Sequence, residues 1–443
     1  MPLRVAVVGS GPAGIYTAEA LTKQAGEPVE IDVLDRLPTP YGLVRYGVAP
    51  DHTSIKSIAG YLRRVLELPS VRFLGGVELG RDVSAADLAA CYDAVVYCTG
   101  AMVDRRLGIP GEDLPGSVAA TDFVNWYCGH PDVPPETFSL DSTDVAVIGV
   151  GNVAVDVVRV LARSADELRA TDVPQEVLDR LAKSQVRTLH MIGRRGPEHA
   201  KFTLKELREL GDLSNCDVSV RHDEAGDGDV SALSRQVRGN VEVLRSWCGR
   251  TPAGRPRRLD VRFWLRPVEI LGTIRVEGLK LERTALVDGR VTGTGEFEVV
   301  PAGMVLRSVG YQSVPLPGVP FDGTTMTVPN VAGRVGEGQY VAGWLKRGPS
   351  GVIGTNKSDA AETVRTLLAD LAVRGERAAP PSRLDDVLAA RRVHPVTYEQ
   401  WLSIEAAEAA LAVALGRGEH VKLTGRSAML AAFGRAGLPG PAL

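Results

Sequence analysis

Residues 9–14 read Gly-Ser-Gly-Pro-Ala-Gly and directly follow the apolar, β-branched run Leu3–Val8. In such a pattern the first glycine permits a tight turn, the second lets a pyrophosphate approach the backbone, and the third lets a helix pack closely on the strand. Apolar periodicity over 15–24 predicts that helix, and a second strand is predicted over 29–34. Asp35 ends this strand, where an acid binds a ribose hydroxyl. This context favours a dinucleotide-binding βαβ unit over a tight turn without a ligand.

A second fingerprint, Gly-Val-Gly-Asn-Val-Ala, occupies residues 149–154 in the same strand-turn-helix context. The strand predicted over 186–192 ends in Arg194 and Arg195, where the first unit has Asp35. Guanidinium groups pair with a 2′-phosphate, which a carboxylate would repel. The pair therefore favours NADP(H) over NAD(H), although two ordinary surface arginines are the simpler interpretation.

Two fingerprints in one chain predict two dinucleotides. The N-terminal site, with its acid, suits the ADP half of a tightly held FAD. The second site suits NADPH. The fold class is therefore α/β, with two dinucleotide-binding Rossmann-like domains in a glutathione-reductase-like flavoprotein architecture.

The composition argues against a nucleic-acid-binding, membrane or secreted protein. The chain has 443 residues, 44% of them hydrophobic and 24% charged, with a net charge of −3. This is ordinary globular composition for two to three domains, without a global basic field for nucleic acid. No apolar run reaches the ~18 residues that a membrane span needs, and the N-terminus lacks the pattern of a secretory signal. We expect a cytoplasmic protein that binds neither nucleic acid nor a membrane.

The cysteines argue against thiol redox chemistry and structural zinc. Their number is odd and no two of them stand at CxxC spacing. Buried, unreactive thiols are the simplest interpretation. The five positions are Cys91, Cys98, Cys128, Cys216 and Cys248.

The rest of the chain gives a coarser prediction. Strands are expected over 93–98, 145–148, 304–309 and 340–342, and helices over 174–183 and from about Ser358. We expect loops over 223–229 and 250–258, antiparallel strands over 259–300, and a helical C-terminus with a break at 379–381.

Three long motifs, far apart in the chain, resemble one known family. They are LPTPYGLVRYGVAPDH at 37–52, FTLKELREL at 202–210 and GWLKRGPSGVIGTN at 343–356. Together they resemble adrenodoxin reductase and the bacterial ferredoxin–NADP reductases similar to it, over about residues 3–415. The resemblance implies a discontinuous FAD domain, 1–103 and 312–443, with an NADP domain inserted at 104–311.

The fingerprints and the resemblance together imply two sets of cofactor-binding residues. For FAD these are Gly9, Gly11, Ala13, Gly14, Asp35, Leu43, Val77, Trp344, Gly351, Val352 and Ile353. For NADP(H) these are Gly151, Asn152, Val153, Ala154, Arg194, Arg195 and Glu206, with Gly351 also near the nicotinamide. Family members commonly carry glutamate where Asp35 stands. Trp344 has a second interpretation, as a core residue.

His52 and Glu209 match a paired histidine and acid beside the flavin–nicotinamide site of the family. We interpret His52 as a residue that positions the nicotinamide or moves protons, with Glu209 orienting it. Hydride transfer itself needs no protein base, because the protein's task is to stack the two rings and exclude water. A loop histidine without a ligand is the alternative.

The implied partner is an iron–sulfur ferredoxin that accepts electrons singly. Ferredoxins are acidic, so we expect them to dock on a basic surface. Arg208 lies in the motif at 202–210, and Arg235, Arg238 and Arg245 recur at helical spacing. A solvated arginine face is the alternative.

Four other kinds of protein share part of this pattern of two dinucleotide fingerprints. A disulfide reductase needs a redox cysteine pair that the chain lacks. A flavin monooxygenase needs a substrate pocket that no motif marks. The small subunit of glutamate synthase usually carries N-terminal iron–sulfur cysteines, and an NADPH-binding sensor would hold NADPH without turnover.

Overall fold

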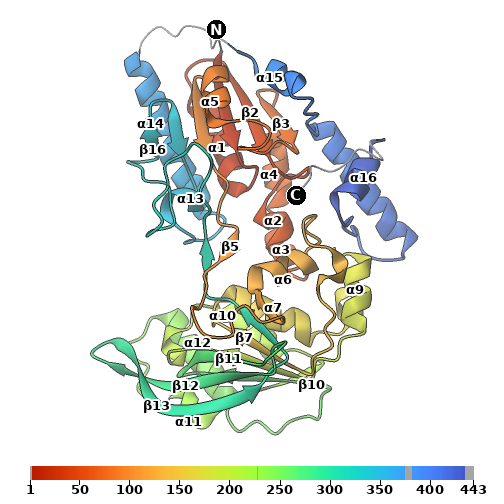
Figure 1. The fold of residues 1–443 in the computed structure, drawn as a ribbon, viewed down its shortest axis with the longest axis vertical. Coiled ribbons are helices and arrows are strands. Elements are labelled where there is room, and N and C mark those ends of the chain that lie inside the picture. The colour runs from red at the N-terminus through yellow and green to blue at the C-terminus, as the bar shows by residue number, and fades with distance from the viewer. Residues whose placement is uncertain (1, 227, 375–381, 435–443) are drawn as a thin grey trace. The chain divides into compact units, whose positions relative to one another are not determined.

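A computed structural model of the chain describes residues 2–226, 228–374 and 382–434 (Figure 1). These residues form two compact units. The first unit contains the described residues of Met1–Val103, His130–Asp132 and Tyr311–Leu443, and the second contains Asp104–Gly129 and Val133–Gly310. Tyr311 and the short segment His130–Asp132 thus lie in the first unit rather than in the inserted domain.

The first unit is built on a six-stranded sheet in the order β16-β17-β4-β1-β2-β3. All neighbours are parallel except β16, which runs antiparallel to β17. The strands are β1 (Leu3–Val8), β2 (Val29–Asp35), β3 (Val71–Gly75), β4 (Ala94–Tyr97), β16 (Arg334–Gly336) and β17 (Gln339–Val341). Because β17 joins β4 by hydrogen bonds, both ends of the chain contribute to one sheet.

Helices cover both faces of this sheet, as a buried parallel sheet requires. Leu3, Val5 and Val7 of β1 enter one apolar core together with α1 and α14, while Ala6 and Val8 enter the core on the other face. The helices are α1 (Pro12–Gln24), α2 (Leu43–Tyr46), α3 (Thr53–Lys56), α4 (Ala59–Leu66), α5 (Ala85–Cys91), α13 (Trp344–Arg347), α14 (Thr355–Arg374), α15 (Leu384–Ala390), α16 (Tyr398–Ala414) and α17 (Arg426–Ala431). Two short strands, β5 (Val103–Asp104) and β15 (Tyr311–Gln312), pair with each other.

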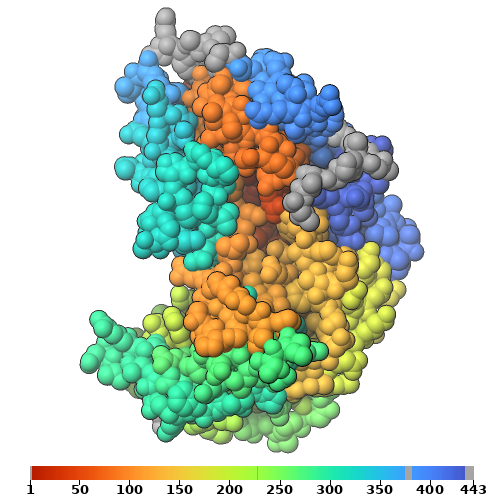
Figure 2. All heavy atoms as spheres, in the orientation of Figure 1, coloured from red at the N-terminus to blue at the C-terminus, as the bar shows by residue number. Residues whose placement is uncertain are grey.

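The second unit repeats the architecture with a six-stranded sheet in the order β6-β14-β7-β8-β10-β9. These strands are β6 (Ser117–Ala119), β7 (Asp144–Ile148), β8 (Thr188–Ile192), β9 (Cys216–Val220), β10 (Arg257–Arg262) and β14 (Met304–Arg307). A separate antiparallel sheet contains β11 (Leu265–Leu271), β12 (Gly278–Val287) and β13 (Arg290–Pro301), and its turquoise hairpin projects from the unit (Figure 2). The helices are α6 (Ala120–Tyr127), α7 (Asn152–Ala162), α8 (Ala165–Leu168), α9 (Gln175–Ala182), α10 (Leu204–Gly211), α11 (His222–Ala225) and α12 (Arg235–Trp247), with 3₁₀ turns at Pro135–Thr137 and Pro197–His199.

The structure confirms both βαβ units and corrects four local predictions. Helix α1 begins at Pro12, because proline suits the first helical position, so Ala13 and Gly14 lie in the helix rather than in the turn. Helix α14 begins at Thr355 rather than near Ser358. The segment predicted as a loop at 223–229 begins with the helical turn α11.

The fourth correction concerns β10, which pairs in parallel with β8 and β9 rather than antiparallel. Its first two residues, Arg257 and Arg258, also lie in the segment predicted as a loop at 250–258. Its alternating polar residues are accommodated by side-chain contacts: Asp260 accepts a hydrogen bond from Ser219 at 2.7 Å and pairs with Arg258 at 3.0 Å. The antiparallel arrangement holds for β11–β13. The predicted break at 379–381 lies outside the described residues.

Within the described ranges, none of the helices is both long and apolar enough to cross a membrane.

Candidate cofactor-binding sites

The glycine loop of the first unit has the shape that a pyrophosphate site requires. Gly9 has φ +110°, and a Cβ there would lie 2.5 Å from the Cys98 carbonyl oxygen. A Cβ on Gly14 would lie 1.8 Å from the Gly9 carbonyl oxygen, so only glycine lets α1 begin this close to β1. Gly11 is the N-cap of α1, and the nearest atom to a Cβ there is Gly42 Cα at 3.9 Å. The helix N-terminus thus presents an uncrowded backbone to an anion.

Asp35 closes β2 and connects three segments around this loop. Its Oδ2 accepts hydrogen bonds from the Ser10 N–H at 2.9 Å and the Ser10 hydroxyl at 2.6 Å, and its Oδ1 accepts one from the Leu37 N–H at 2.9 Å. Its carbonyl accepts the N–H of the buried Val77 at 2.8 Å. A carboxylate has about four lone-pair sites, so capacity remains for a ribose hydroxyl.

The segment 41–43 lies over the same loop. The Tyr41 N–H donates to the Ser10 carbonyl at 3.0 Å, and a Cβ on Gly42 would lie 3.0 Å from Gly11 Cα. Leu43, a predicted FAD contact, is the first residue of α2. The segment therefore forms one wall of the phosphate site.

The third motif brings the C-terminal part of the chain to α1. A Cβ on Gly343 would lie 2.5 Å from the Cβ of Ala13, so this contact requires glycine. Lys346 and Arg347 reach Asp359 of α14 at 3.1 and 3.3 Å, and these ion pairs hold the motif on α14.

The glycine-rich segment before α14, residues 351–354, offers backbone N–H groups as hydrogen-bond donors. Gly351 has φ +80°, and the Val352 N–H donates to the Thr355 hydroxyl at 3.1 Å. Among the residues that the structure describes, the N–H groups of Gly351, Ile353 and Gly354 have no acceptor. A run of free N–H groups at the start of a 20-residue helix suits a group that gains negative charge, as the flavin N1–C2=O edge does.

Trp344 is half-buried and is not a core residue. Its indole N–H donates to the Ser350 carbonyl at 3.1 Å, and its ring lies against Tyr311 with centroids 5.5 Å apart. The side chain is therefore fixed at the edge of the glycine-rich run, where a ring system can pack against it.

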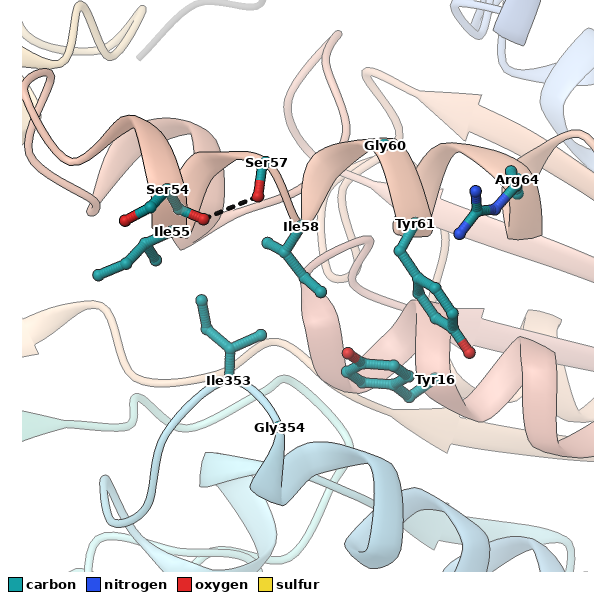
Figure 3. Close-up of a pocket in the computed structure, with 10 residues that line it drawn as sticks. All are labelled: Tyr16, Ser54, Ile55, Ser57, Ile58, Gly60, Tyr61, Arg64, Ile353 and Gly354. Atoms are coloured by element: carbon teal, nitrogen blue, oxygen red, sulfur yellow. Dashed lines mark hydrogen bonds between the residues drawn. The ribbon is translucent and has the colours of Figure 1, made fainter.

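A pocket of about 520 Å³ also lies in the first unit (Figure 3). Figure 3 shows Tyr16 and Tyr61 side by side on one of its walls, with Ile353 pointing toward Ile55 and Ile58. The two tyrosine rings have centroids 6.0 Å apart, and Lys357 donates to the Tyr61 hydroxyl at 3.0 Å. The pocket thus adjoins the N-terminus of α14.

The second unit has an equivalent glycine loop between β7 and α7. A Cβ on Gly149 would lie 2.1 Å from the Ser308 carbonyl oxygen, and nothing lies within 4 Å of one on Gly151, the N-cap of α7. Ala154 is fully buried where the helix meets the strand, and Val153 is half-buried. The Asn152 side chain accepts the Thr203 N–H at 2.9 Å, so it connects this loop to α10.

Arg194 and Arg195 follow β8 and are exposed. Their backbone carbonyls accept hydrogen bonds from the Thr284 hydroxyl and the Trp264 N–H, which fix the turn. Over the described part of the chain, neither guanidinium group has a carboxylate partner. Two uncompensated cations beside an open helix N-terminus suit a 2′-phosphate.

Glu206 is buried at the start of α10, where its carboxylate accepts the Thr203 hydroxyl at 2.8 Å. Thr203 is the N-cap of this helix. Glu206 therefore supports the helix N-terminus, and its role toward a ribose stays a prediction.

Glu209 and His52, the predicted pair, belong to different units. Glu209, on α10, lies 3.6 Å from the guanidinium of the fully buried Arg159, which also pairs with Asp156 at 2.8 Å. His52, in the first unit, is buried at the N-cap of α3. The contact between them stays a prediction.

The four arginines proposed for docking lie on two helices that pack together, Arg208 on α10 and the others on α12. Arg208 and Arg235 are exposed and Arg238 is partly exposed. Arg245 instead donates to the Gly226 and Gly228 carbonyls at 2.8 Å, so its guanidinium supports a loop.

All five cysteines are free thiols, and four of them are buried. Burial raises the pKa of the Cys98 and Cys216 thiols to about 12. Both therefore stay protonated and unreactive at neutral pH, as predicted.

Sequence reasoning missed Ser10, Arg159 and Arg45. Ser10 and Arg45 stand inside motifs that the sequence singled out, but their partners Asp35 and Glu408 lie 25 and 363 residues away. Of the three, Arg159 alone could have been found from the sequence, because it stands three residues after Asp156 on a predicted helix, a spacing that allows an ion pair.

The chain is similar to known proteins over nearly its whole length. The family model described as pyridine nucleotide-disulphide oxidoreductase matches residues 3–192. The NADPH-ferredoxin reductase FprA of Mycobacterium tuberculosis (strain ATCC 25618 / H37Rv) is 44% identical over 97% of this chain and 98% of its own. The mitochondrial NADPH:adrenodoxin oxidoreductase of Arabidopsis thaliana is 39% identical over 97% of this chain and 95% of its own.

The fold is also similar to that of solved structures. The solved structure of Mycobacterium tuberculosis FprA in complex with NADPH has a TM-score of 0.92 and 43% identity, and the match covers 97% of this chain and 99% of that chain. The predicted α/β architecture with two Rossmann-like units is confirmed. The resemblance seen in the three sequence motifs is confirmed too, and the chain belongs to the family of NADPH-ferredoxin reductases and NADPH:adrenodoxin oxidoreductases.

Proposed function

We propose that this chain is an FAD-dependent NADPH:ferredoxin oxidoreductase, with FAD in the first unit and NADPH in the second. One contrast carries the proposal: Asp35 ends the strand after the first glycine loop, while Arg194 and Arg195 follow the equivalent strand after the second. A carboxylate suits a ribose hydroxyl, and two exposed guanidinium groups suit a 2′-phosphate. The names of the relatives at 39–44% identity support the same function.

FAD, when bound, accepts a hydride from NADPH and passes electrons on one at a time. The chain's own residues bind and orient. The N-termini of α1 and α7, capped by Gly11 and Gly151, would hold the two pyrophosphates. The N–H groups of Ile353 and Gly354 would stabilise negative charge on the flavin ring.

His52 in the first unit and Glu209 in the second are the proposed positioning residues. Their task is to place the nicotinamide and to hold or move a proton beside the ring. The guanidinium of the buried Arg159 lies 3.6 Å from the Glu209 carboxylate and helps to hold that side chain in place.

The electron acceptor in this proposal is an acidic iron–sulfur protein. Arg208, Arg235 and Arg238 offer it cations on the α10 and α12 surface. The proposal also places the protein in the cytoplasm, where reduced thiols such as these five persist.

The function is tested by NADPH-driven reduction of cytochrome c with and without added ferredoxin. The proposal predicts a yellow protein whose cytochrome c reduction depends on ferredoxin. A flavin monooxygenase would consume oxygen and NADPH in the presence of an organic substrate, without this dependence. Cytochrome c reduction that is the same with and without any ferredoxin tested would overturn the proposal.

A further inference from the structure

Helix α16 and the irregular segment after it, residues 415–425, hold the loop that walls the phosphate site of the first unit. The contact centres on Arg45 of α2, whose guanidinium lies 2.5 Å from the carboxylate of Glu408 on α16. Both side chains are buried, with 9% and 1% of their surface exposed. The two residues are 363 positions apart, yet they form a charge-assisted hydrogen bond inside one unit.

Aromatic rings enclose this ion pair. The Arg45 guanidinium lies 4.9 Å from the ring centroid of Trp401 and 5.1 Å from that of Tyr46. Burial by itself would lower the pKa of Arg45, but the Glu408 carboxylate outweighs it and the pKa is raised. Arg45 is therefore charged, and without Glu408 its buried guanidinium would lose this carboxylate partner.

The segment after α16 adds a second set of contacts. The ammonium group of Lys422 donates to the Arg45 carbonyl at 2.8 Å, and the Leu423 N–H donates to Glu408 at 3.0 Å. Lys422 is itself buried. Glu408 of α16 thus holds the side chain of Arg45, and Lys422 in the segment after α16 holds its backbone.

The loop needs this support because its backbone is strained. Tyr41 has φ +80° and Gly42 has φ +49°, and a bulky side chain such as that of Tyr41 is strained in this region. The Tyr41 ring packs edge-on against Trp401 of α16 with centroids 6.0 Å apart. Without α16, the loop loses the contacts that keep Tyr41 in this conformation.

The loop in turn shapes the phosphate site. The Tyr41 N–H bonds to the Ser10 carbonyl, and Gly42 lies against Gly11, the N-cap of α1. We propose that Arg45 is a positioning residue for FAD: with Glu408 and Trp401 it holds the 41–46 loop against the glycine loop and so controls how tightly FAD is retained. This inference rests on the proposed function, which places FAD in the first unit.

The test compares FAD binding by the full-length apoprotein with Arg45→Met, Arg45→Lys and Glu408→Gln. FAD affinity and release rate are measured by flavin fluorescence, the flavin environment by visible circular dichroism, and folding by thermal unfolding. The matched control is Glu405→Gln, because Glu405 also lies on α16 but pairs with Arg63 of α4 at 3.0 Å rather than with Arg45.

We expect Arg45→Met and Glu408→Gln to weaken FAD binding by about tenfold or more, as loss of a buried charge partner implies. Arg45→Lys should recover most of this affinity, and Glu405→Gln should match the parent protein. KM for NADPH measured with saturating FAD should be unchanged for all four.

If Arg45→Met does not fold, Glu408→Gln still decides the question. FAD affinity and circular dichroism equal to the control in Arg45→Met or Glu408→Gln, where the variant folds, would overturn the inference while the proposed function stands. Failure of the parent apoprotein to bind FAD would instead overturn the proposed function.

Discussion

The carboxylate of Asp35 accepts two hydrogen bonds from Ser10, one from its N–H at 2.9 Å and one from its hydroxyl at 2.6 Å. The acid at the end of β2 therefore shapes the glycine loop as well as standing where a ribose hydroxyl binds. Ser10 is fully buried, so water does not replace these bonds.

Replacing Asp35 with alanine should weaken FAD binding about 10- to 100-fold, because hydrogen bonds to a charged group contribute roughly 1.5–3 kcal/mol. Ser10→Ala should have a smaller effect, since the backbone hydrogen bond survives. FAD titration into the apoprotein measures both. Glu30→Ala, an exposed change on the same strand, is the control, and equal affinities for Asp35→Ala and the control would contradict the role of Asp35.

Arg194→Ala and Arg195→Ala should each raise KM for NADPH about tenfold or more, because each removes a charge-assisted bond to the 2′-phosphate. KM for NADH should not change, since NADH lacks that phosphate. Steady-state kinetics with both nucleotides checks this, with Arg290→Ala on the exposed hairpin as the control. A parallel rise for NADH would show that the arginines act on the fold and not on the phosphate.

His52→Gln and Glu209→Gln should slow flavin reduction by NADPH about 10- to 100-fold, the size of effect expected from a misplaced reactant. Glu209→Asp should retain more activity, because it keeps the charge facing Arg159. Stopped-flow absorbance measures the rate directly. His199→Gln, a change at an exposed histidine, provides the baseline, and rates equal to it would remove both residues from the site.

Turnover with ferredoxin should fall steeply as salt is raised, whereas turnover with ferricyanide should not, because the Debye length shrinks from ~10 Å at 0.1 M to ~3 Å at 1 M. Arg208→Glu and Arg235→Glu should raise KM for ferredoxin and flatten the salt dependence. Arg245 is excluded from this set because its guanidinium donates to the Gly226 and Gly228 carbonyls. The same salt dependence for both acceptors would count against docking on α10 and α12.

His130 should make stability pH-dependent below neutrality. Burial lowers its pKa to about 4, and its Nδ1 accepts the Asp132 N–H at 3.2 Å, which requires a neutral ring. Between about pH 6.5 and 4 the unfolded state binds the extra proton, so stability rises with pH across this window, by about 3 kcal/mol in total.

Urea unfolding at several pH values measures how steeply the free energy of unfolding rises with pH. His130→Gln should remove most of this pH dependence, and His199→Gln, which changes an exposed histidine, should preserve it. A slope that survives in His130→Gln would assign the effect to other groups.

Local chemistry made the two glycine loops predictable, because Gly9, Gly14 and Gly149 stand where a side chain would collide with backbone. Asp35 and the Arg194–Arg195 pair were predictable for a similar reason, since each follows a strand that has a clear apolar pattern. Periodicity failed at β10, where polar residues alternate in a parallel strand because Ser219 and Arg258 satisfy Asp260.

Contacts between distant segments were not predictable from one sequence. Arg45 stands in a motif that the sequence singled out, but nothing in the spacing connects it with Glu408 or Trp401 in the C-terminal helix. Likewise, Arg245 shares a face of α12 with Arg238, seven residues earlier, yet its guanidinium donates to the Gly226 and Gly228 carbonyls, which the spacing does not reveal.

The most direct test of the account is anaerobic stopped-flow reduction of the purified protein, with the flavin absorbance followed after mixing with NADPH or with NADH. The account predicts a yellow protein that NADPH bleaches much faster than NADH does, with the preference lost when Arg194 and Arg195 are both replaced by alanine. A colourless protein that FAD does not reconstitute, or equal bleaching by the two nucleotides, would contradict it.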